Sequence, residues 1–422
     1  MNARTQKIIG GIILLILLAS FILITNYYTD IEKQGEQETQ LRVKNIILFI
    51  GDGMGIGQIA VLKYRSLPNK TNIEKLSNVG LIATYSADSL VTDSAAVATA
   101  IATGFKTKNH MVGVLPNGSK VETVLELAES LNKSTGLVTT TRITHATPAA
   151  FASHVTSRYD ENEIAVQMLE SGVDILLGGG RKIMKEHLSL AESLGFKIIF
   201  NRTQFLTVGN AIKLLGLFAE DHMSYAIERN TTTEPSLAEM TKVAINILSR
   251  NGRGFFLMVE GGRIDHACHE NNMTKLIEEM VEFDEAIGVA LEYAKTRNDT
   301  IIIVTADHET GGLTILNPPT TNATEINYKW TTKEHTANPV PVYIWATQNI
   351  SNLTFKDNTE IGKFLKELLT EKPKTPPKET ITSTLARAIS FLPQQFYMQN
   401  RDKISFYGFS ALMPLSDSNP HI

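Results

Sequence analysis

Residues 45–55 read NIILFIGDGMG. The apolar residues at 46–50 form an unbroken run, which is typical of a strand buried on both faces. The run stops at Gly51-Asp52-Gly53, which predicts a loop and places Asp52 just beyond the carboxyl end of the strand. Strands buried on both faces belong to parallel sheets covered by helices, so we expect an α/β fold.

Strand-like and helix-like segments alternate along the chain on both sides of this stretch. We expect strands near 81–85 and at 136–141, 174–179, 255–260, 300–307 and 340–346. We expect helices at 56–64, from Ser94 onward, and at 160–170, 237–250, 272–295 and 361–369. This alternation predicts a doubly wound, mostly parallel central sheet with helices on both faces. In such folds ligands collect at the carboxyl ends of the strands.

The composition is that of a globular protein of 422 residues, with 43% hydrophobic and 20% charged residues. The formal net charge of −4 gives no electrostatic footprint for nucleic acid, so we expect no nucleic-acid partner. Cys268 is the one cysteine, which excludes an intramolecular disulfide.

The N-terminus predicts a membrane anchor. Residues 8–25 form an uncharged apolar run long enough to span a bilayer as a helix. Arg4 and Lys7 precede the run and an acidic segment follows it, which favours a single-pass protein whose folded part lies outside the cytoplasm. A cleaved signal peptide is the alternative, and the protein would then be secreted. No clear cleavage site follows the run, which favours the anchor.

We divide the chain into an anchor at 1–28, a polar stalk at 29–44, a folded domain at 45–370, and a Pro/Lys-rich linker and C-terminal tail at 371–422. The tail has no role that we can assign. Ten Asn-x-Ser/Thr sequons, for example at Asn69 and Asn230, fit an exported glycoprotein.

Carboxylates and imidazoles fall at the predicted strand ends. Asp52, Glu260, Asp307 and His308 end or follow strands, and His335 precedes one. Asp265 and His269 have i, i+4 spacing, which places both on one face of a helix. Asp307 and His308 can reach one ion only if the chain has already left the strand. Carboxylate and imidazole without thiolate predict a site for Zn²⁺ or a similar divalent ion, with ligands for more than one ion.

A second element reads VTDSAAVATAIATG at 91–104. Asp93 or Ser94 could be a simple N-cap of a small-residue helix. The functional interpretation places the Ser94 hydroxyl at a helix N-terminus, where backbone N–H groups favour an anion. Next to a metal ion such a hydroxyl could become a nucleophile.

Six blocks together resemble the alkaline phosphatases. They are NIILFIGDGMG (45–55), VTDSAAVATAIATG (91–104), THATPAAFASHVTSR (144–158), MVEGGRIDHACHEN (258–271), VTADHETGG (304–312) and EHTANPVPV (334–342). Their order and spacing agree with that family over roughly residues 45–346.

The resemblance implies a ligand set for two zinc ions and a third ion, usually Mg²⁺. Asp265, His269 and His335 would hold the first zinc, and Asp52, Asp307 and His308 the second. Asp52 would also bridge to the third ion, together with Thr147 and Glu260. Ser94 would be the nucleophile, Arg158 would bind two phosphate oxygens, and Asp93 would orient Arg158.

At two positions this sequence carries histidine where the family varies. His145 and His266 stand where some bacterial members have aspartate and lysine. His145 would then reach the third ion through water at most, so that ion could be Mg²⁺ or another divalent ion. His266 would contact phosphate, with a charge that depends on pH. We expect His154 to be structural, and His110, His187, His222 and His421 to lie outside the site.

The implied activity is hydrolysis of small phosphate monoesters through a phosphoserine at Ser94, without an organic cofactor. The family is usually dimeric, so a homodimer is expected. Two alternatives are a phosphodiesterase of the same superfamily and a membrane protein that binds phosphate without turnover. Diesterases of this type typically have a threonine nucleophile, which argues against the first. The complete ligand set argues against the second.

Overall fold

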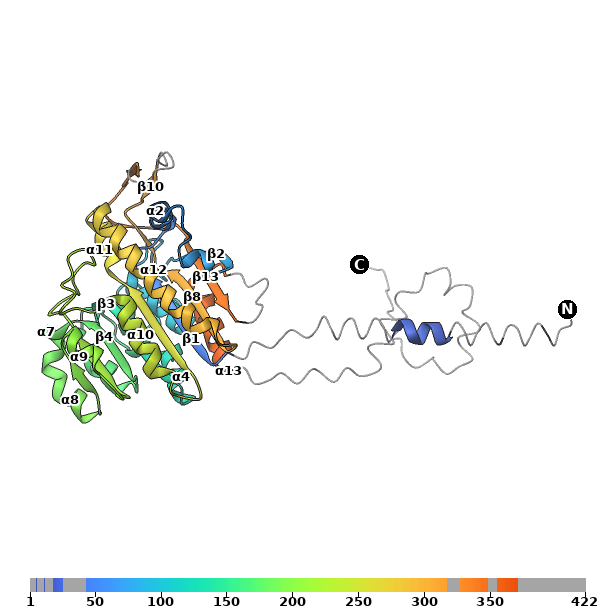
Figure 1. The fold of residues 1–422 in the computed structure, drawn as a ribbon, viewed down its shortest axis with the longest axis horizontal. Coiled ribbons are helices and arrows are strands. Elements are labelled where there is room, and N and C mark those ends of the chain that lie inside the picture. The colour runs from blue at the N-terminus through green and yellow to red at the C-terminus, as the bar shows by residue number, and fades with distance from the viewer. Residues whose placement is uncertain are drawn as a thin grey trace, which may run out of the picture. The chain divides into compact units, whose positions relative to one another are not determined.

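The structure is a computed structural model that describes residues 5, 11, 18–25, 43–316, 326–347 and 355–370. A nine-stranded sheet forms its centre, in the order β2-β13-β8-β1-β7-β3-β4-β6-β5 (Figure 1). Its strands are β1 (Asn45–Gly51), β2 (Asn78–Ile82), β3 (Ser134–Arg142), β4 (Ile175–Gly179), β5 (Lys197–Ile199), β6 (Leu214–Leu217), β7 (Phe255–Gly261), β8 (Thr300–Ala306) and β13 (Val340–Ala346). Among these described strands, β13 alone runs antiparallel to its neighbours β8 and β2. The predicted mostly parallel sheet is confirmed.

Two short ribbons lie outside this sheet. They are β9 (Glu309–Thr310) with β12 (His335–Thr336), and β10 (Thr314–Ile315) with β11 (Tyr328–Lys329). The helices are α2 (Ile56–Ser66), η1 (Ile73–Lys75), α3 (Ser94–Thr103), α4 (Val124–Ser130), α5 (Ala146–Ala152), α6 (Glu161–Glu170), α7 (Arg181–Met184), η2 (Lys185–His187), α8 (Leu188–Ser193), α9 (Arg202–Leu206), α10 (Leu237–Leu248), α11 (Arg263–His269), α12 (Met273–Lys295) and α13 (Asn358–Thr370).

Helices cover both faces of the sheet, as two successive residues of β7 show. Phe255 contacts Tyr293 of α12, with ring centroids 5.8 Å apart, whereas Phe256 stacks on Phe151 of α5, also at 5.8 Å. Because successive side chains of a strand point to opposite faces, α12 and α5 pack on opposite sides of the sheet. Figure 1 shows α10 and α12 across one of these faces.

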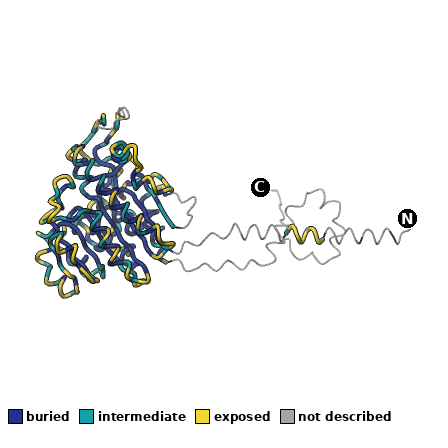
Figure 2. The backbone as a smooth tube through the Cα atoms, viewed as in Figure 1, coloured by how far each residue is buried: buried dark blue, intermediate teal, exposed yellow. Residues whose placement is uncertain are grey.

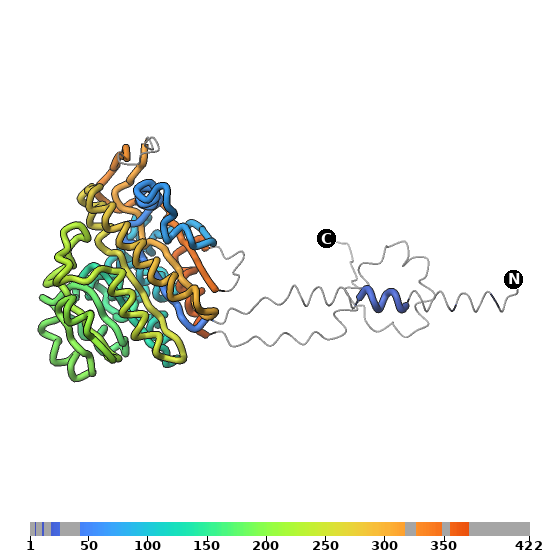
Figure 3. The backbone as a smooth tube through the Cα atoms, viewed as in Figure 1, coloured from blue at the N-terminus to red at the C-terminus, as the bar shows by residue number. Residues whose placement is uncertain are grey.

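Strand β1 lies between β7 and β8, which come from much later in the chain (Figure 3). All seven residues of β1, β7 and β8 are buried, which explains their continuous apolar sequences (Figure 2). The parallel register pairs Ile50 with Glu260 and Gly51 with Ala306. The carboxyl ends of the three strands therefore meet at one edge.

Some elements differ from the sequence-based prediction. The strand expected near 81–85 occupies 78–82, because Val79 and Leu81 pair with β13 and the chain leaves the sheet after Ile82. The prediction also missed α4, α5, β5 and β6. Thr123 and Glu126 form a capping box at the start of α4, a signal that could have revealed this helix.

The predicted anchor at 1–28 overlaps the described residues only at 5, 11 and 18–25, which are helical and mostly exposed. No helix within the described ranges is long and apolar enough to cross a membrane. Residues 29–42 of the predicted stalk and the tail at 371–422 lie outside the described residues.

Candidate active site

The predicted metal ligands are supplied by the carboxyl edge of three central strands. Asp52 follows β1, Glu260 is near the end of β7, and Asp307 and His308 follow β8. Strand β8 ends at Ala306, so the chain has left the sheet before Asp307, as two adjacent ligands to one ion require. His335 reaches this edge through the β9–β12 ribbon, in which it pairs with Thr310.

Asp265, His269 and His335 converge at this edge. Asp265 and His269 lie one turn apart on α11, and His269 Nε2 is 3.2 Å from Asp265 Oδ2. His335 Nε2 is 3.7 Å from Asp265 Oδ1 and 3.2 Å from His269 Nε2. The Nδ1 atoms of both rings contact backbone carbonyl oxygens. Thr92 O lies 2.9 Å from His335 Nδ1, and Lys333 O contacts His269 Nδ1. This arrangement turns both Nε2 atoms toward Asp265.

Asp52, Asp307 and His308 form an adjoining group that is completely buried. His308 Nε2 is 3.2 Å from Asp307 Oδ2 and 3.6 Å from Asp52 Oδ1. One donor atom from each of the three residues lies within 4.8 Å of the others, a spacing at which they could hold one ion. Asp265, His308 and His335 meet the same criterion, so His308 lies between the two predicted zinc sites.

Gly53 allows the loop after β1 to close over these groups. Its φ of +72° is a conformation that side-chain-bearing residues rarely adopt. A Cβ atom there would lie 2.9 Å from Asp265 Oδ1 and 3.0 Å from the Asp265 backbone. The Gly53 N–H donates to Asp307 Oδ1 at 3.0 Å, which fixes that carboxylate.

Asp93, Ser94 and Arg158 form the opposite side of the site. Asp93 is the N-cap of α3, and its Oδ1 accepts from Ala96 N at 3.0 Å. Its other oxygen accepts from Arg158 Nη1 at 3.0 Å, so Asp93 is both a cap and the partner of Arg158. Ser94 is the first residue of α3, and its Oγ lies 3.3 Å from His308 Nε2.

His145 lies between Arg158 and the carboxylates predicted for the third ion. Asp52, His145 and Glu260 each have one possible metal-ligand atom, and these three atoms lie within 4.8 Å of one another. However, His145 Nε2 is 3.0 Å from Arg158 Nη2, and a guanidinium can only donate. Because a neutral imidazole has one lone-pair nitrogen, Nδ1 must then carry the proton. A protonated Nδ1 cannot bind a cation directly, and the contact of His145 with the third ion through water stays a prediction.

Several buried polar atoms at this edge have no hydrogen-bond partner among the described residues. They are both carboxylate oxygens of Asp52, Asp307 Oδ2, Glu260 Oε1, Thr147 Oγ1 and His145 Nδ1. Buried carboxylate oxygens are costly unless they are paired or coordinate a metal. The donors are oxygen and imidazole nitrogen without thiolate, a set suited to Zn²⁺ and, at the oxygen-rich end, to Mg²⁺. The residues therefore fit divalent cations.

A family model described as alkaline phosphatase matches residues 43–326. The chain belongs to the alkaline phosphatase family. It is 40% identical over 300 residues to alkaline phosphatase 4 of Bacillus subtilis, covering 66% of this chain and 64% of that one. It is 36% identical over 329 residues to the human tissue-nonspecific alkaline phosphatase, covering 63% of each. The chain thus spans somewhat less than two thirds of these curated relatives.

Solved alkaline phosphatases share the fold. The enzyme from the Antarctic bacterium TAB5 is 35% identical, with a TM-score of 0.73, and the match covers 79% of this chain and all of that chain. Another structure of TAB5 alkaline phosphatase, with a histidine replaced by aspartate, has Mg bound in its M3 site.

The electrostatic surroundings of neighbouring carboxyl groups in this site differ. Burial, together with Asp307 and other nearby carboxylates, raises the pKa of Asp52 well above its usual range. Burial also raises the pKa of Asp307 to about 6 and that of Glu260 to about 7. Burial acts in the same direction on Asp265, but the hydrogen bond from His269 and the neighbouring imidazoles outweigh it and lower the pKa of Asp265. The carboxylates next to Asp52 thus lack compensating positive charge.

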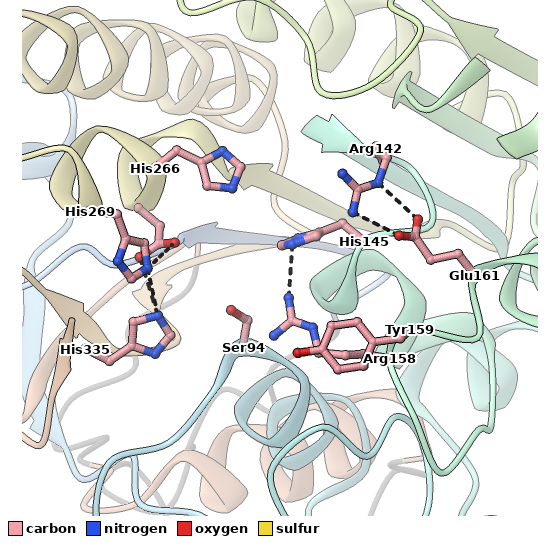
Figure 4. A pocket seen from close by; sticks show the side chains of 10 residues that line it. Ser94, Arg142, His145, Arg158, Tyr159, Glu161, His266, His269 and His335 are labelled. Carbon is pink, nitrogen blue, oxygen red and sulfur yellow. Dashed lines mark hydrogen bonds and ion pairs between the residues drawn. The ribbon is translucent and has the colours of Figure 1, made fainter. Parts of the chain in front are cut away.

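A pocket of about 290 Å³ opens onto these groups (Figure 4). Its lining includes Ser94, Arg158 and His145, together with Asp265, His266, His269 and His335. Ser94 lies between the His269–His335 pair and Arg158. The structure thus brings together every predicted site residue, and their roles as ligands or catalysts stay predictions.

The lining also includes Arg142, Tyr159 and Glu161, which the sequence-based prediction missed. Arg142 ends β3, so the same strand-end signal that identified the acidic residues could have found it. Its guanidinium binds Glu161 through two hydrogen bonds of 2.9 and 3.1 Å. Tyr159 directly follows Arg158.

Two of the histidines expected outside the site are close to it. The His222 ring lies 4.5 Å from the His266 ring, and Arg142 Nη1 is 2.7 Å from His222 Nε2. His110 Nδ1 lies 3.3 Å from Asp93 Oδ2. Both residues contact residues of the site without lining the pocket, so the expectation that they lie outside the site stays a prediction. His154 is structural as expected, since its ring binds Glu126 and Gly113 O. His187 does not line the pocket, and His421 is outside the described residues.

The surroundings of His266 favour its neutral imidazole form. Burial, with Arg263 opposing charge on the ring, lowers the pKa of His266 to about 4 even though Asp265 acts in the other direction. Arg263 Nη1 is 2.7 Å from His266 Nδ1 and can only donate, so Nδ1 is the acceptor and Nε2 carries the proton. A neutral His266 would therefore present its Nε2–H to the pocket, and the expected pH dependence of its charge stays a prediction.

Proposed function

We propose that this protein hydrolyses phosphate monoesters by transferring the phosphoryl group to Ser94 and then to water. The observation that carries the proposal is the position of the Ser94 hydroxyl. It lies at the floor of a pocket, at the start of a helix, between a cluster of unpartnered metal-ligand atoms and the Arg158 guanidinium. With cations bound to the cluster, positive groups would lie on both sides of the hydroxyl and favour a phosphate there.

The cations would be held by three sets of residues. We assign Asp265, His269 and His335 to one zinc ion, and Asp52, Asp307 and His308 to a second. Asp52, Glu260 and Thr147 would hold a third ion, Mg²⁺ or another divalent ion, with His145 reaching it through water. When bound, the cations supply Lewis-acid charge that stabilises negative charge developing on the attacking and leaving oxygens.

The protein's own groups position the phosphoryl group and transfer it. Arg158 presents its guanidinium to two phosphate oxygens, and the ion pair with Asp93 fixes its direction. His266 offers its Nε2–H as an uncharged donor to the bound ester. Ser94 Oγ attacks phosphorus as the ester P–O bond breaks, which leaves the alcohol and a phosphoserine. Water then attacks phosphorus on the opposite side, the P–O bond to Ser94 breaks, and phosphate leaves.

Hydrolysis of p-nitrophenyl phosphate at alkaline pH tests this proposal. The metal-loaded full-length protein, purified in detergent, should turn the ester over, and chelation or Ser94→Ala should abolish turnover. Bis(p-nitrophenyl) phosphate and p-nitrocatechol sulfate serve as matched diester and sulfate substrates. Turnover only of one of these would assign the site to a different reaction class, and binding of phosphate without turnover would support a binding protein.

Membrane attachment and dimer formation are further parts of the proposal. They rest on the apolar run at 8–25 and on the family resemblance. We propose that this run anchors the protein with its folded part outside the cytoplasm, with glycans on exposed sequons if the host adds them. The full chain should fractionate with membranes and a chain lacking residues 1–28 should not. Sedimentation of the latter would give the number of subunits.

A further inference from the structure

The residues that line the pocket differ in their exposure to solvent. Ser94, at the floor, is 3% exposed, whereas Tyr159, which also lines the pocket, is 72% exposed. A phosphoryl group on Ser94 occupies the floor. The ester substituent must therefore extend toward solvent, past the more exposed lining residues.

Tyr159 provides the one large apolar surface among the described residues that line the pocket. The other lining residues are Ser94, Arg142, His145, Arg158, Glu161, Asp265, His266, His269 and His335, all of which are polar or charged. Most of them already contact other side chains of the protein, for example Arg142 with Glu161 and Arg158 with Asp93. Among the described lining residues, only Tyr159 carries a largely exposed six-membered aromatic ring.

The backbone of Tyr159 is fixed while its ring stays accessible. The preceding residue is tied down, since Arg158 N donates to His110 O at 2.8 Å. The ring rests beside the His110 imidazole, with centroids 5.7 Å apart and an angle of 35° between the rings. The phenol oxygen makes no hydrogen bond to the described residues. Figure 4 shows the ring beside Arg158, at the end of the pocket away from His335.

We infer that Tyr159 is a leaving-group platform, and that monoesters whose substituent carries a flat aromatic ring are the preferred substrate class. An aromatic substituent would stack on Tyr159, which adds a contact that small alkyl esters lack. The hydroxyl is not needed for stacking, so phenylalanine should replace tyrosine at this position. The inference rests on the proposed phosphatase function.

Benzyl phosphate and ethyl phosphate provide a matched test. Both release a primary alcohol, so bond cleavage is closely similar and the ring is the main difference. Tyr159→Ala should lower the ratio of kcat/KM for benzyl over ethyl phosphate by roughly three- to tenfold, the range expected for loss of one aromatic contact. Tyr159→Phe should keep the wild-type ratio. Phe105→Ala, which removes another exposed ring that does not line the pocket, should keep it too.

Inhibition by inorganic phosphate separates stacking from a disturbed Arg158. Phosphate has no substituent, so its inhibition constant should be the same in Tyr159→Ala and wild type. Equal losses for the two esters, or weaker phosphate inhibition that accounts for the loss, would overturn this inference while leaving the proposed function in place. If the metal-loaded wild type hydrolyses neither ester, the proposed function fails and this inference fails with it.

Discussion

The two sides of the pocket are built in opposite ways. On one side, Asp93 and Arg158 satisfy each other, and the Asp93 carboxylate also accepts backbone N–H groups from Ala96 and His110. On the other side, both oxygens of Asp52 are buried without a donor, and Asp307 and Glu260 each have one such oxygen. The anion-binding side is complete as a protein structure, whereas the cation-binding side is complete only with its ions. Substitutions on the two sides should therefore have different consequences.

The largest expected effect is loss of activity on the cation-binding side. Asp52→Ala removes the carboxylate shared by two predicted ion sites, and several kcal/mol of transition-state stabilisation with it, which corresponds to a fall in kcat/KM on the order of 10³-fold. Steady-state kinetics with p-nitrophenyl phosphate and metal analysis of the purified variant measure both effects. Near-normal activity with one fewer bound ion would contradict the assignment of Asp52.

Gly53→Ala should affect the same side through the backbone. The added methyl group would press on Asp265 and disfavour the left-handed conformation. We expect metal affinity and kcat/KM to fall roughly 10- to 100-fold, the range for lost support of metal ligands. Gly252→Ala is a control, because no atom lies within 4 Å of the Cβ position there. Equal metal affinity in both variants would show that Gly53 does not support the site.

Arg158→Lys should cause a smaller loss on the anion-binding side. Lysine keeps the charge but cannot bind two oxygens in a fork, so we expect kcat/KM to fall roughly 10- to 100-fold and the inhibition constant for phosphate to rise. Metal content should be unchanged. A drop in bound metal would mean that the two sides are not independent.

In the metal-free protein, substitutions on the two sides of the pocket should change the free energy of unfolding in opposite directions. Asp52→Asn replaces an uncompensated buried carboxylate, so at pH 8 it should stabilise the metal-free protein by about 1 kcal/mol or more. Asp93→Asn weakens a satisfied ion pair and should destabilise it by roughly 1–3 kcal/mol. Urea unfolding of both variants measures these changes. Destabilisation by both substitutions would contradict the proposed contrast.

The smallest expected effect is a pH dependence of metal-free stability. The pKa values of Asp307 and Glu260, about 6 and about 7, lie above the value near 4 of an unfolded carboxyl group. Between about pH 4 and pH 7 the folded state keeps protons that the unfolded chain has lost, so stability falls as pH rises. Bound cations should remove this part of the dependence. Burial also raises the pKa of Glu279 to about 8, and this residue acts in the same direction in the metal-free and the metal-loaded protein. The difference in pH dependence between these two forms therefore reports on the site alone.

The two sides of the pocket also differ in how far their residues could be predicted from the sequence. Asp52, Asp307 and His308 follow long apolar strands, and parallel strands bring their carboxyl ends to one edge whatever lies between them. His335 was placed at this edge because it precedes a predicted strand. Arg158 was identified only through the family resemblance, because loop geometry brings it to the site. Tyr159 and His222 carry no local signal, since their roles depend on neighbours far away in the chain. The short strands β5 and β6 were missed because segments of three or four residues do not show a period.

Acid-quench labelling of Ser94 tests the central claim most directly. The metal-loaded protein is mixed with a phosphate monoester, quenched in acid, digested and analysed by mass spectrometry. The proposal predicts a phosphoryl group on the peptide that contains Ser94, and none after chelation or in Ser94→Ala. Rapid turnover without any phosphorylated Ser94, and with activity retained in Ser94→Ala, would contradict it.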